Sequence, residues 1–383
     1  LLAAMLSALP FIFSGILDPV SAFFESMSGL TTTGSTAIVN LEVVPKSILL
    51  WRSLTHWIGG IGIIVLFVAL LPQIAGSAVF LFNAEVSGFS NNRILPRIHT
   101  TAVALFLIYL VMTIGLTIAL LFLGMSPFDA VNHACSAIAT GGFSTYNNSI
   151  AHFDSAAIEF VLGIAMILAG GNFALYYYMT HSGIKALLAD LEFRVYICLL
   201  FAVTAMITWN IVQVNDFTLF EGFRYAFFQV ASFGSTTGFV SHNYDDWPAF
   251  SKLLLGLMYF TGACAGSTAG GLKMSRVMLL GKTVVRELKR LVHPRSVSVV
   301  RLEGKRVEET TVQSTAAYFI LYMALLALVF LILSFESAFS LESNLTAAIT
   351  CINNVGPGLG VVGPNGTYAD YSVLSKIVLS FAM

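Results

Sequence analysis

The sequence predicts an all-α polytopic membrane protein in which four tandem helix–pore-loop–helix repeats surround a single pseudo-fourfold pore. Three observations predict this fold class: an unusually apolar composition, a separation of basic from acidic connectors, and a Gly/Thr-rich segment that recurs four times. Of the 383 residues, 57% are hydrophobic and 10% are charged, whereas average soluble domains carry about 25% charged residues. A soluble protein of this composition could not cover its surface with polar groups.

Several apolar runs have the length that a membrane-spanning helix needs. A helix crosses the hydrocarbon core with ~20 residues, and residues 100–123 and 311–335 are two such runs. Helices are the expected spanning elements because lipid offers no other partner for backbone N–H and C=O groups. The runs do not alternate as the strands of a β-barrel do. Because the chain begins and ends in apolar residues, we expect its first and last helices to be truncated.

The charged residues lie between the apolar runs and separate by sign. Most Lys and Arg fall in three connectors, which contain Arg93 and Arg97, Lys185 and Arg194, and a dense basic stretch at 273–306. The positive-inside rule places these connectors in the cytoplasm. The remaining connectors are mainly acidic and are expected to face outward. They are either ordinary solvated loops or a mouth that concentrates cations.

A segment centred on a glycine recurs at Gly34, Gly141, Gly238 and Gly356, each time before another long apolar run. The helix that precedes the glycine, of about twelve residues, is too short to span the bilayer and must enter and return. Polar backbone at membrane depth is tolerated only where it lines a cavity or is buried in protein. Four re-entrant loops in one chain can therefore supply the four quarters of a pore.

These copies divide the chain into four repeats. The expected boundaries are 1–82 with a pore loop at 18–36, 83–190 with a pore loop at 126–145, 191–306 with a pore loop at 217–240, and 307–383 with a pore loop at 341–360. An acidic residue or proline is expected to open each short helix. The long helices expected after the loops are 46–71, 156–180, a run from Pro248 and a truncated run from Tyr371.

The residue types in the four loops suit a dehydrated cation. Potassium filters bind the ion with backbone carbonyls, and glycine permits the left-handed backbone angles that turn successive carbonyls inward. No charged residue interrupts the four stretches, whereas an anion pore would show Arg or Lys. Thr-Gly tracts also form ordinary turns, but that reading does not explain four copies. The predicted potassium-binding residues are Thr32, Thr33, Gly34, Ala139, Thr140, Gly141, Thr236, Thr237, Gly238, Asn354, Val355 and Gly356.

These residues carry a resemblance to a known family. Residues 23–36 (FFESMSGLTTTGST) resemble the first pore loop of the Trk/Ktr/HKT potassium transporters, and 51–62 (WRSLTHWIGGIG) resemble the inner helix that follows it. Residues 84–88 (AEVSG) and 168–177 (LAGGNFALYY) resemble the bacterial TrkH branch in particular. The resemblance covers essentially the whole chain.

The resemblance implies potassium uptake across the bacterial cytoplasmic (inner) membrane by a homodimer with one pore per subunit. It also implies a cytoplasmic TrkA-type nucleotide-binding subunit that controls opening, and potassium is the ion that we expect the filter to bind. We expect K⁺ and Rb⁺ to pass in preference to Na⁺ and Li⁺. Because only one glycine aligns in all four loops, selectivity should be looser than in tetrameric channels with a longer TVGYG tract.

The third inner helix contains a glycine-rich interruption at residues 261–272. Each glycine costs a helix about 1 kcal/mol relative to alanine, and the family resemblance places an intramembrane loop here. We expect this segment to gate the pore and the basic stretch to couple it to the cytoplasmic partner. The alternative for the glycine-rich segment is close helix packing. The alternative for the basic stretch is simple positive-inside anchoring or contact with anionic lipid. The predicted gate residues are Gly262, Gly266, Ser267, Thr268, Gly270 and Gly271.

Charges within the expected helices are interpreted as structural braces for the loops. Glu25 is the expected partner of Arg52, and Glu221 the expected partner of Arg224 one turn later. His56 and His133 have no metal-ligand spacing around them and are expected to be satisfied polar groups. The four cysteines form no CxxC pair and are expected to be small buried hydrophobes.

Other functions fit the sequence less well. An enzyme would need a nucleophile or metal cluster, a voltage-gated channel would need an Arg-rich helix, and no feature suggests nucleic acid. A secondary transporter would usually show an inverted repeat and ionisable residues at mid-membrane, but these four repeats run in the same sense. A potassium symporter coupled to another cation on the same scaffold remains the alternative to a gated pore.

Overall fold

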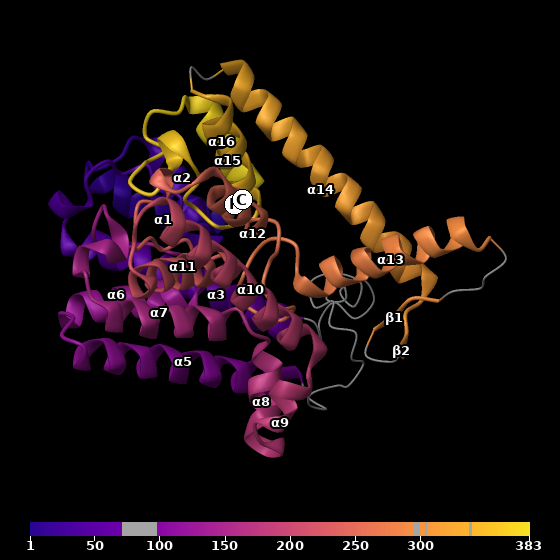
Figure 1. Cartoon of the computed structure of the whole chain (residues 1–383). Helices are drawn as coiled ribbons and strands as arrows, with labels where there is room; N and C mark the ends of the chain where they lie inside the picture. The colour runs from indigo at the N-terminus through magenta and orange to yellow at the C-terminus, as the bar shows by residue number, and fades with distance from the viewer. Residues whose placement is uncertain (71–97, 295–298, 303–304, 337–338) are drawn as a thin grey trace.

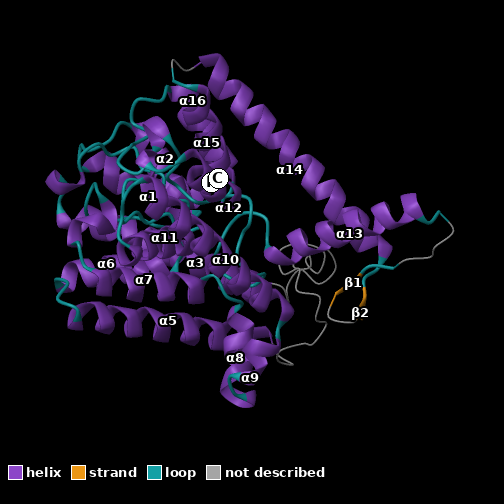
Figure 2. Ribbon diagram, in the orientation of Figure 1, coloured by secondary structure: helices purple, strands orange, loops and turns teal. Residues whose placement is uncertain are grey.

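The computed structural model describes residues 1–70, 98–294, 299–302, 305–336 and 339–383. The expected connector with Arg93 and Arg97, the 84–88 segment and the boundary at 82/83 lie outside these described residues. The described chain is almost entirely helical (Figure 2), with one two-stranded hairpin, β1 (Arg301–Leu302) and β2 (Lys305–Arg306).

The helices follow one order four times, which is an outer helix, a short pore helix, a loop with a 3₁₀ turn, and an inner helix (Figure 1). The outer helices are α1 (Leu2–Phe13), α5 (Ile98–Phe122), α10 (Leu191–Val214) and α14 (Glu309–Glu336). The pore helices are α2 (Pro19–Leu30), α6 (Pro127–Ile138), α11 (Leu219–Gly234) and α15 (Leu341–Ile352). The 3₁₀ turns are η1 (Leu41–Val43), η3 (Ser149–Phe153), η4 (Tyr244–Asp246) and η5 (Gly360–Val362).

The inner helices differ more from one another. They are α3 (Lys46–Leu70), α7 (Ala156–Ala169) with α8 (Phe173–Ser182), α12 (Ala249–Met258) and α16 (Val373–Ala382). Two further helices lie at the end of the molecule with the basic connectors, α9 (Lys185–Ala189) and α13 (Met274–Val292). Among the described residues, α5, α10 and α14 are each long and apolar enough to cross a membrane, and the bent pair α7–α8 could form a fourth span.

Each pore helix begins at a side-chain cap, which explains why four short helices are stable. Asp18 accepts hydrogen bonds from the backbone N–H groups of Val20 and Ser21 at the start of α2. The caps of the other three are hydroxyls, on Ser126, Thr218 and Ser340. The expected acidic residue or proline is present at each start, as Pro19 and Pro127 in α2 and α6 and as Glu221 and Glu342 in the first turns of α11 and α15. The caps satisfy N–H groups that the first turn of a helix leaves free.

The continuous helix expected at 156–180 is wrong, because the chain bends by 94° between α7 and α8. The backbone groups freed at the break bond to the third repeat. Cys264 donates its N–H to the Gly170 carbonyl (2.9 Å), and Phe173 donates to the Gly266 carbonyl (3.1 Å). Broken helices are tolerated at membrane depth where neighbouring protein satisfies these groups.

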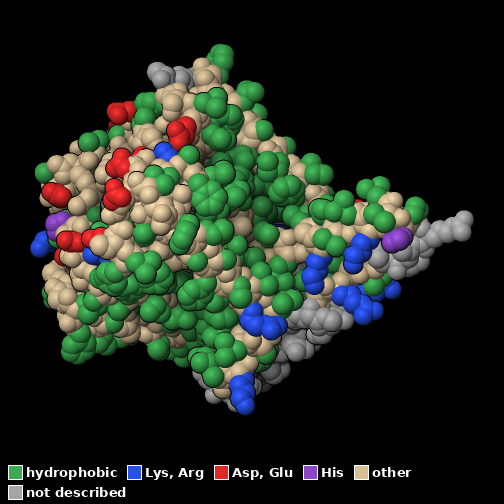
Figure 3. Space-filling model, viewed as in Figure 1, with side chains coloured by type: hydrophobic (Ala, Val, Ile, Leu, Met, Phe, Trp, Pro, Cys, Tyr) green, Lys and Arg blue, Asp and Glu red, His purple; other side chains and the backbone are tan. Residues whose placement is uncertain are grey.

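The two ends of the molecule carry opposite charge, as the orientation argument predicts. Figure 3 shows acidic side chains at the end near the pore-helix starts, and most visible Lys and Arg near α9, α13 and the hairpin. Beneath the hairpin, Val300, Leu302 and Val312 pack on Leu279 of α13 in a small separate core. Cys135, Cys264 and Cys351 are buried as expected, but Cys198 is exposed on α10.

Two buried ion pairs tie inner helices to pore helices. Arg52 of α3 donates to Glu25 of α2 (Nε–Oε1 2.8 Å), and both side chains are almost completely buried. That predicted pair is confirmed. The predicted Arg224–Glu221 pair is wrong, because Arg224 of α11 reaches across to Glu159 of α7 (2.7 Å), while Glu221 accepts from Thr218 in a capping box at the start of its own helix.

We expect Glu159→Gln to lower the free energy of unfolding far more than Glu221→Gln. The substitution removes the charge of the buried Glu159 and leaves Arg224 with the exposed Asp154 (3.1 Å), a loss of up to about 3–5 kcal/mol. Glu221, in contrast, is a partly exposed cap at the start of its own helix. The thermal unfolding midpoints of both variants, purified in the same detergent, measure the difference. Equal losses would mean that Glu159 does not hold Arg224.

Candidate ion-conducting pore

All four pore helices end with the same backbone conformation. The second residue after each helix is left-handed, at Thr32, Thr140, Thr236 and Asn354, with φ between 54° and 59°. The glycine two residues later is also left-handed, with φ between 77° and 90°. Between them, the N–H groups of Thr33, Gly141, Thr237 and Val355 bond back to the carbonyl five residues earlier at 2.8–2.9 Å.

This geometry corrects the sequence alignment of the second loop by one residue. Gly142, with φ +77°, occupies the position of Gly34, Gly238 and Gly356, whereas Gly141 occupies the position of Thr33 and Thr237. The doubled glycine allowed either register. The end of α6 at Ile138 decides it, because the left-handed residue follows two positions later.

The four loops close into a ring through contacts between a glycine and a neighbouring carbonyl. A Cβ added to Gly34 would lie 2.1 Å from the Gly141 oxygen, and one added to Gly142 would lie 2.1 Å from the Thr237 oxygen. The next two contacts are Gly238 to the Val355 oxygen (1.9 Å) and Gly356 to the Thr33 oxygen (2.6 Å). The carbonyls involved are all equivalent, so the loops surround one axis in chain order.

Hydrogen bonds between the segments that follow the glycines form a second closed ring. Leu41 donates its N–H to Asn147 Oδ1 (2.8 Å), and Ile150 donates to the Val240 carbonyl (2.9 Å). The Tyr244 hydroxyl donates to the Gly358 carbonyl (2.8 Å), and the Tyr368 N–H donates to the Thr36 carbonyl (2.8 Å). Each bond joins one repeat to the next, and the last joins the fourth to the first.

The predicted filter residues are therefore gathered in one place, together with Gly142. Their side chains do not all serve the same purpose. Thr33 and Thr237 bond the hydroxyls of Thr31 and Ser235 behind the loops (2.9 and 2.7 Å). Asn354 crosses to the first repeat and donates to the Thr31 carbonyl (2.7 Å). Carbonyls and neutral hydroxyls are the oxygens that a potassium filter requires.

The segment between α12 and α13 lies against the inner ends of three of the four pore loops. Thr268 donates to the Ile138 carbonyl and accepts from the Thr140 hydroxyl, both at 3.2 Å. Gly270 donates its N–H to Thr236 Oγ1 (2.8 Å). Cβ atoms added to Gly270 and Gly271 would meet Asn353 at 2.7 and 3.0 Å, so the segment fits closely below the fourth loop as well.

The other predicted gate residues, Gly262, Gly266 and Ser267, contact other parts of the segment or Asn172 rather than the pore loops. Gly262 packs against the Gly270 and Leu272 carbonyls, with 2.6 and 2.5 Å to an added Cβ. Gly266 is left-handed and lies against the Asn172 side chain. Ser267 closes an internal turn by donating to the Cys264 carbonyl (2.6 Å).

Sequence analysis missed the residue that anchors this segment. The Glu192 carboxylate of α10 accepts backbone N–H bonds from Ala265 and Ser275, both at 2.9 Å, on the two sides of the segment. Two acidic residues, Asp190 and Glu192, lie between Lys185 and Arg194 in a connector expected to be basic, and they were the available signal. Asn172 was also missed, although the Gly-Gly-Asn sequence marks a helix break.

A half-buried carboxylate joins two of the outer turns. Asp245 of η4 accepts from the Gly360 N–H (3.3 Å) in the fourth repeat. Burial raises the pKa of Asp245, and the Gly360 hydrogen bond acts in the opposite direction. His133 is satisfied by the Asp129 carbonyl (2.8 Å) and Ser144 Oγ (2.9 Å). His56 departs from expectation, since its Nε2 has no hydrogen-bond partner among the described residues.

Four re-entrant loops closed into a ring of carbonyls, inside a helical membrane protein, define a cation-conducting transport protein. Comparisons with known proteins agree with this class. The sequence profile of the TrkH family of cation transport proteins matches residues 6–383, and the chain belongs to that family. Because this is a transport family, the prediction of a non-enzymatic protein is confirmed as well.

The similarity to individual relatives extends over nearly the whole chain. The Trk system potassium uptake protein TrkH of Salmonella typhimurium is 40% identical over 97% of this chain and 77% of the relative. The protein of that name from Escherichia coli K12 is also 40% identical, over 94% and 75%. The crystal structure of the potassium transporter TrkH from Vibrio parahaemolyticus superposes with a TM-score of 0.89 at 36% identity, covering all of this chain and 79% of that one. The predicted fold class is thereby confirmed.

We expect Gly142→Ala to reduce cation flux through the reconstituted protein by roughly tenfold or more, because the added carbon would overlap the Thr237 carbonyl in a left-handed backbone. Gly124→Ala is the matched control, since Gly124 is also left-handed (φ +92°) but has open space around it. Liposome flux assays compare the two. A tolerated alanine at Gly142 would exclude the corrected register.

Proposed function

We propose that this chain carries potassium ions into the bacterial cytoplasm through a selective, gated pore lined by its four loops. The ring of glycine–carbonyl contacts is the observation that carries the proposal. The family and the potassium uptake function named for the relatives support it. Potassium is thus the transported substrate, and the protein is a multi-pass component of the cytoplasmic (inner) membrane.

The proposed potassium site consists of the loop residues named from the sequence. Gly142 is added, because in the second loop it occupies the position that Gly34, Gly238 and Gly356 occupy in the others. The ligands would be backbone carbonyls, since neutral oxygens replace the ion's water without trapping it. The pore helices end at this ring, so their partly negative C-terminal ends favour a cation there. The four-repeat division of the chain is proposed on the same grounds, because each expected pore loop contains one pore helix and one of these glycines.

The segment at 261–272 is proposed to be the gate. Its support is the set of contacts that Thr268, Gly270 and Gly271 make with three loops directly on the cytoplasmic side of the ring. The contacts of Thr268 and Gly270 with the loops are hydrogen bonds, whereas Ala263, Cys264 and Ala269 of the same segment pack in the hydrophobic core. Opening would require the loss of the two backbone hydrogen bonds to Glu192 or a movement of α13.

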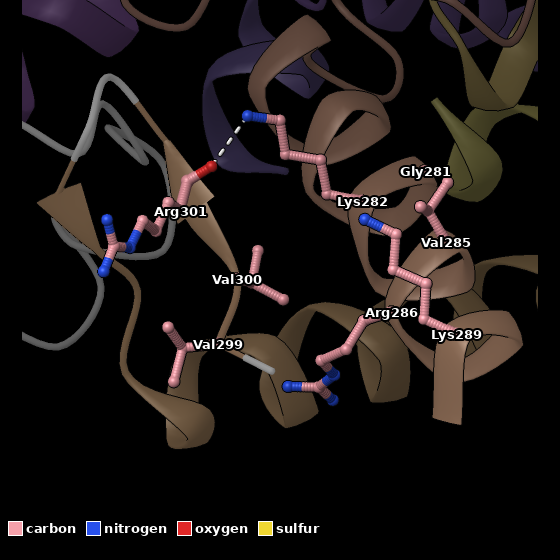
Figure 4. A pocket seen from close by; sticks show the side chains of 8 residues that line it. All are labelled: Gly281, Lys282, Val285, Arg286, Lys289, Val299, Val300 and Arg301. Carbon is pink, nitrogen blue, oxygen red and sulfur yellow. Dashed lines mark hydrogen bonds between the residues drawn. The ribbon is translucent and has the colours of Figure 1, made fainter. Parts of the chain in front are cut away.

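We further propose that α13 and the hairpin form the surface through which a TrkA-type cytoplasmic subunit acts. A groove of about 260 Å³ lies between them, and Figure 4 shows side chains that line it, among them Lys282, Arg286, Lys289 and Arg301. Lys282 donates to the Arg301 carbonyl (2.7 Å), and Glu309 holds the Arg286 guanidinium with two hydrogen bonds, which raise the pKa of Arg286. Lys289 and Arg301 make no ion pair among the described residues, so acidic groups of a partner suit this groove.

We also propose that the protein forms a homodimer, and the resemblance to the Trk/Ktr/HKT potassium transporters supports this proposal. The apolar side of α13 is exposed at Val284, Leu288 and Leu291, and α13 and α14 extend beyond the helical bundle (Figure 1). Light scattering of the detergent-solubilised protein measures the oligomeric state. A monomer would remove this part of the proposal without affecting the pore.

For the complete protein in liposomes, we expect K⁺ and Rb⁺ flux to exceed Na⁺ and Li⁺ flux. Gly34→Ser and Gly238→Ser should reduce this preference by roughly tenfold, because a side chain at either position overlaps a neighbouring carbonyl. Isotope uptake or a cation-sensitive dye measures each flux. Flux without selectivity would keep the pore and remove the filter assignment, and K⁺ flux that requires a Na⁺ or H⁺ gradient would indicate the coupled symporter.

Deletion within residues 264–270 should raise K⁺ flux in the absence of any cytoplasmic partner, because it removes the contacts that close the inner end of the ring. Glu192→Ala is a milder variant that leaves the sequence of the segment intact and removes the acceptor of two N–H groups. We expect it to raise flux in the same direction. Liposome flux with and without the regulatory subunit is the measurement.

The coupling surface is tested in the same assay. Lys289→Glu with Arg301→Glu should make the wild-type gate insensitive to the partner, while the deletion variant stays open regardless. Unchanged or lost flux in both Glu192→Ala and the deletion variant, with normal thermal unfolding, would remove the gate assignment.

A further inference from the structure

The second pore loop lacks a side chain at a position where the other three loops have one. Thr33, Thr237 and Val355 occupy this position in the first, third and fourth loops, and Gly141 occupies it in the second. The space beside Gly141 is filled by the imidazole of His56. A Cβ added to Gly141 would lie 2.4 Å from His56 Nδ1 and 2.5 Å from its Cγ.

His56 belongs to the inner helix α3 of the first repeat and is completely buried. Its ring stacks on Phe143, with centroids 3.9 Å apart and planes 15° apart. The Phe143 N–H points to His56 Nδ1 at 3.5 Å. The imidazole therefore contacts the second loop on both sides of Gly142, at Gly141 and at Phe143.

The same loop is fixed from the other side by the ring of carbonyls. The Gly141 oxygen lies against Gly34 of the first loop, and Gly142 lies against the Thr237 oxygen of the third. A displacement of Gly141 away from the axis would open the first of these contacts. The loop cannot prevent this with its own side chains, since neither Ala139 nor Gly141 has the hydroxyl that links Thr31 to Thr33.

We propose that His56 is a positioning residue for the second pore loop, and that its ring replaces the side chain missing from Gly141 and thereby helps to set ion selectivity. This inference rests on the proposed function of the loops as a potassium filter. It concerns shape above all, because a flat ring fits between Gly141 and the Phe143 ring. The hydrogen bond from the Phe143 N–H to Nδ1 is long at 3.5 Å, whereas the stacked ring contact with Phe143 is close.

The test is a compensation cycle with His56→Ala, Gly141→Val and the double variant, reconstituted in liposomes. Each single change should lower the ratio of K⁺ to Na⁺ flux by about tenfold, one by leaving a cavity and the other by overpacking. The double variant should return to within about threefold of wild type, because the valine side chain fills the space that the ring leaves. Single effects that simply multiply in the double variant would overturn the proposal.

Two further variants distinguish a specific positioning of the second loop by His56 from a general loss of packing around the filter. His56→Phe keeps a flat ring and should retain nearly the wild-type ratio, and a loss as large as that of His56→Ala would contradict the proposal. Gly142→Ala is the matched control, because its added carbon meets the Thr237 carbonyl rather than His56. Adding His56→Ala to Gly142→Ala should not restore the flux ratio. If it did, the cavity left by His56→Ala would be relieving overpacking anywhere in the filter rather than at Gly141 alone.

Folding and function are read separately in the same preparations. Thermal unfolding midpoints identify any variant that does not fold, and Gly141→Ala with His56→Ala then replaces the valine pair as a smaller version of the same cycle. Absence of selective K⁺ flux in the wild type would overturn the proposed function itself. Selective wild-type flux with a multiplicative cycle would overturn only the role of His56.

Discussion

The contact between a glycine Cα and the carbonyl of the next loop is the constraint on which the rest of this structure depends. Each of the four loops contributes one glycine and one carbonyl, and each contact is too close for a Cβ. Because the contacts run from loop to loop and close on themselves, a displacement of one loop changes its contacts with both neighbouring loops. The buried ion pairs, the outer hydrogen-bond ring and the helix caps all hold pore helices in the places that these contacts require.

Sequence reasoning predicted the repeat, the loops and the Arg52–Glu25 pair, because these depend on composition and on local order along the chain. It failed where two repeats meet. The register of the second loop depends on where α6 ends, and the sequence Gly-Gly permits two answers. Arg224 had an acidic residue one turn away, yet the ion pair forms with Glu159 of another repeat, since helix capping already engages Glu221.

The glycine-rich segment between α12 and α13 illustrates how irregular backbone survives at membrane depth. Glu192, Gly170, Phe173 and Thr236 each provide or accept a hydrogen bond that the segment's own backbone would otherwise lack. The break in α7–α8 is part of the same solution, because it presents a free carbonyl and a free N–H to the segment. From sequence, these appeared as two unrelated features, a helix of 25 residues and an interrupted helix, because neither run indicates that it contacts the other.

A pore made from one chain need not support its four quarters in the same way. In the first and third loops, a threonine hydroxyl behind the ring bonds to a hydroxyl two residues earlier. The second and fourth loops have no such pair, and rings from other parts of the chain take its place, His56 beside Gly141 and the Tyr368 hydroxyl on the Gly356 carbonyl (2.9 Å). The backbone at the ring is thus nearly fourfold symmetric, while the contacts that support it are alike in opposite loops and differ between adjacent loops. Local hydroxyl pairs are part of the loop itself, whereas the rings belong to a helix and a connector outside it, so the second and fourth loops take this support from other parts of the chain.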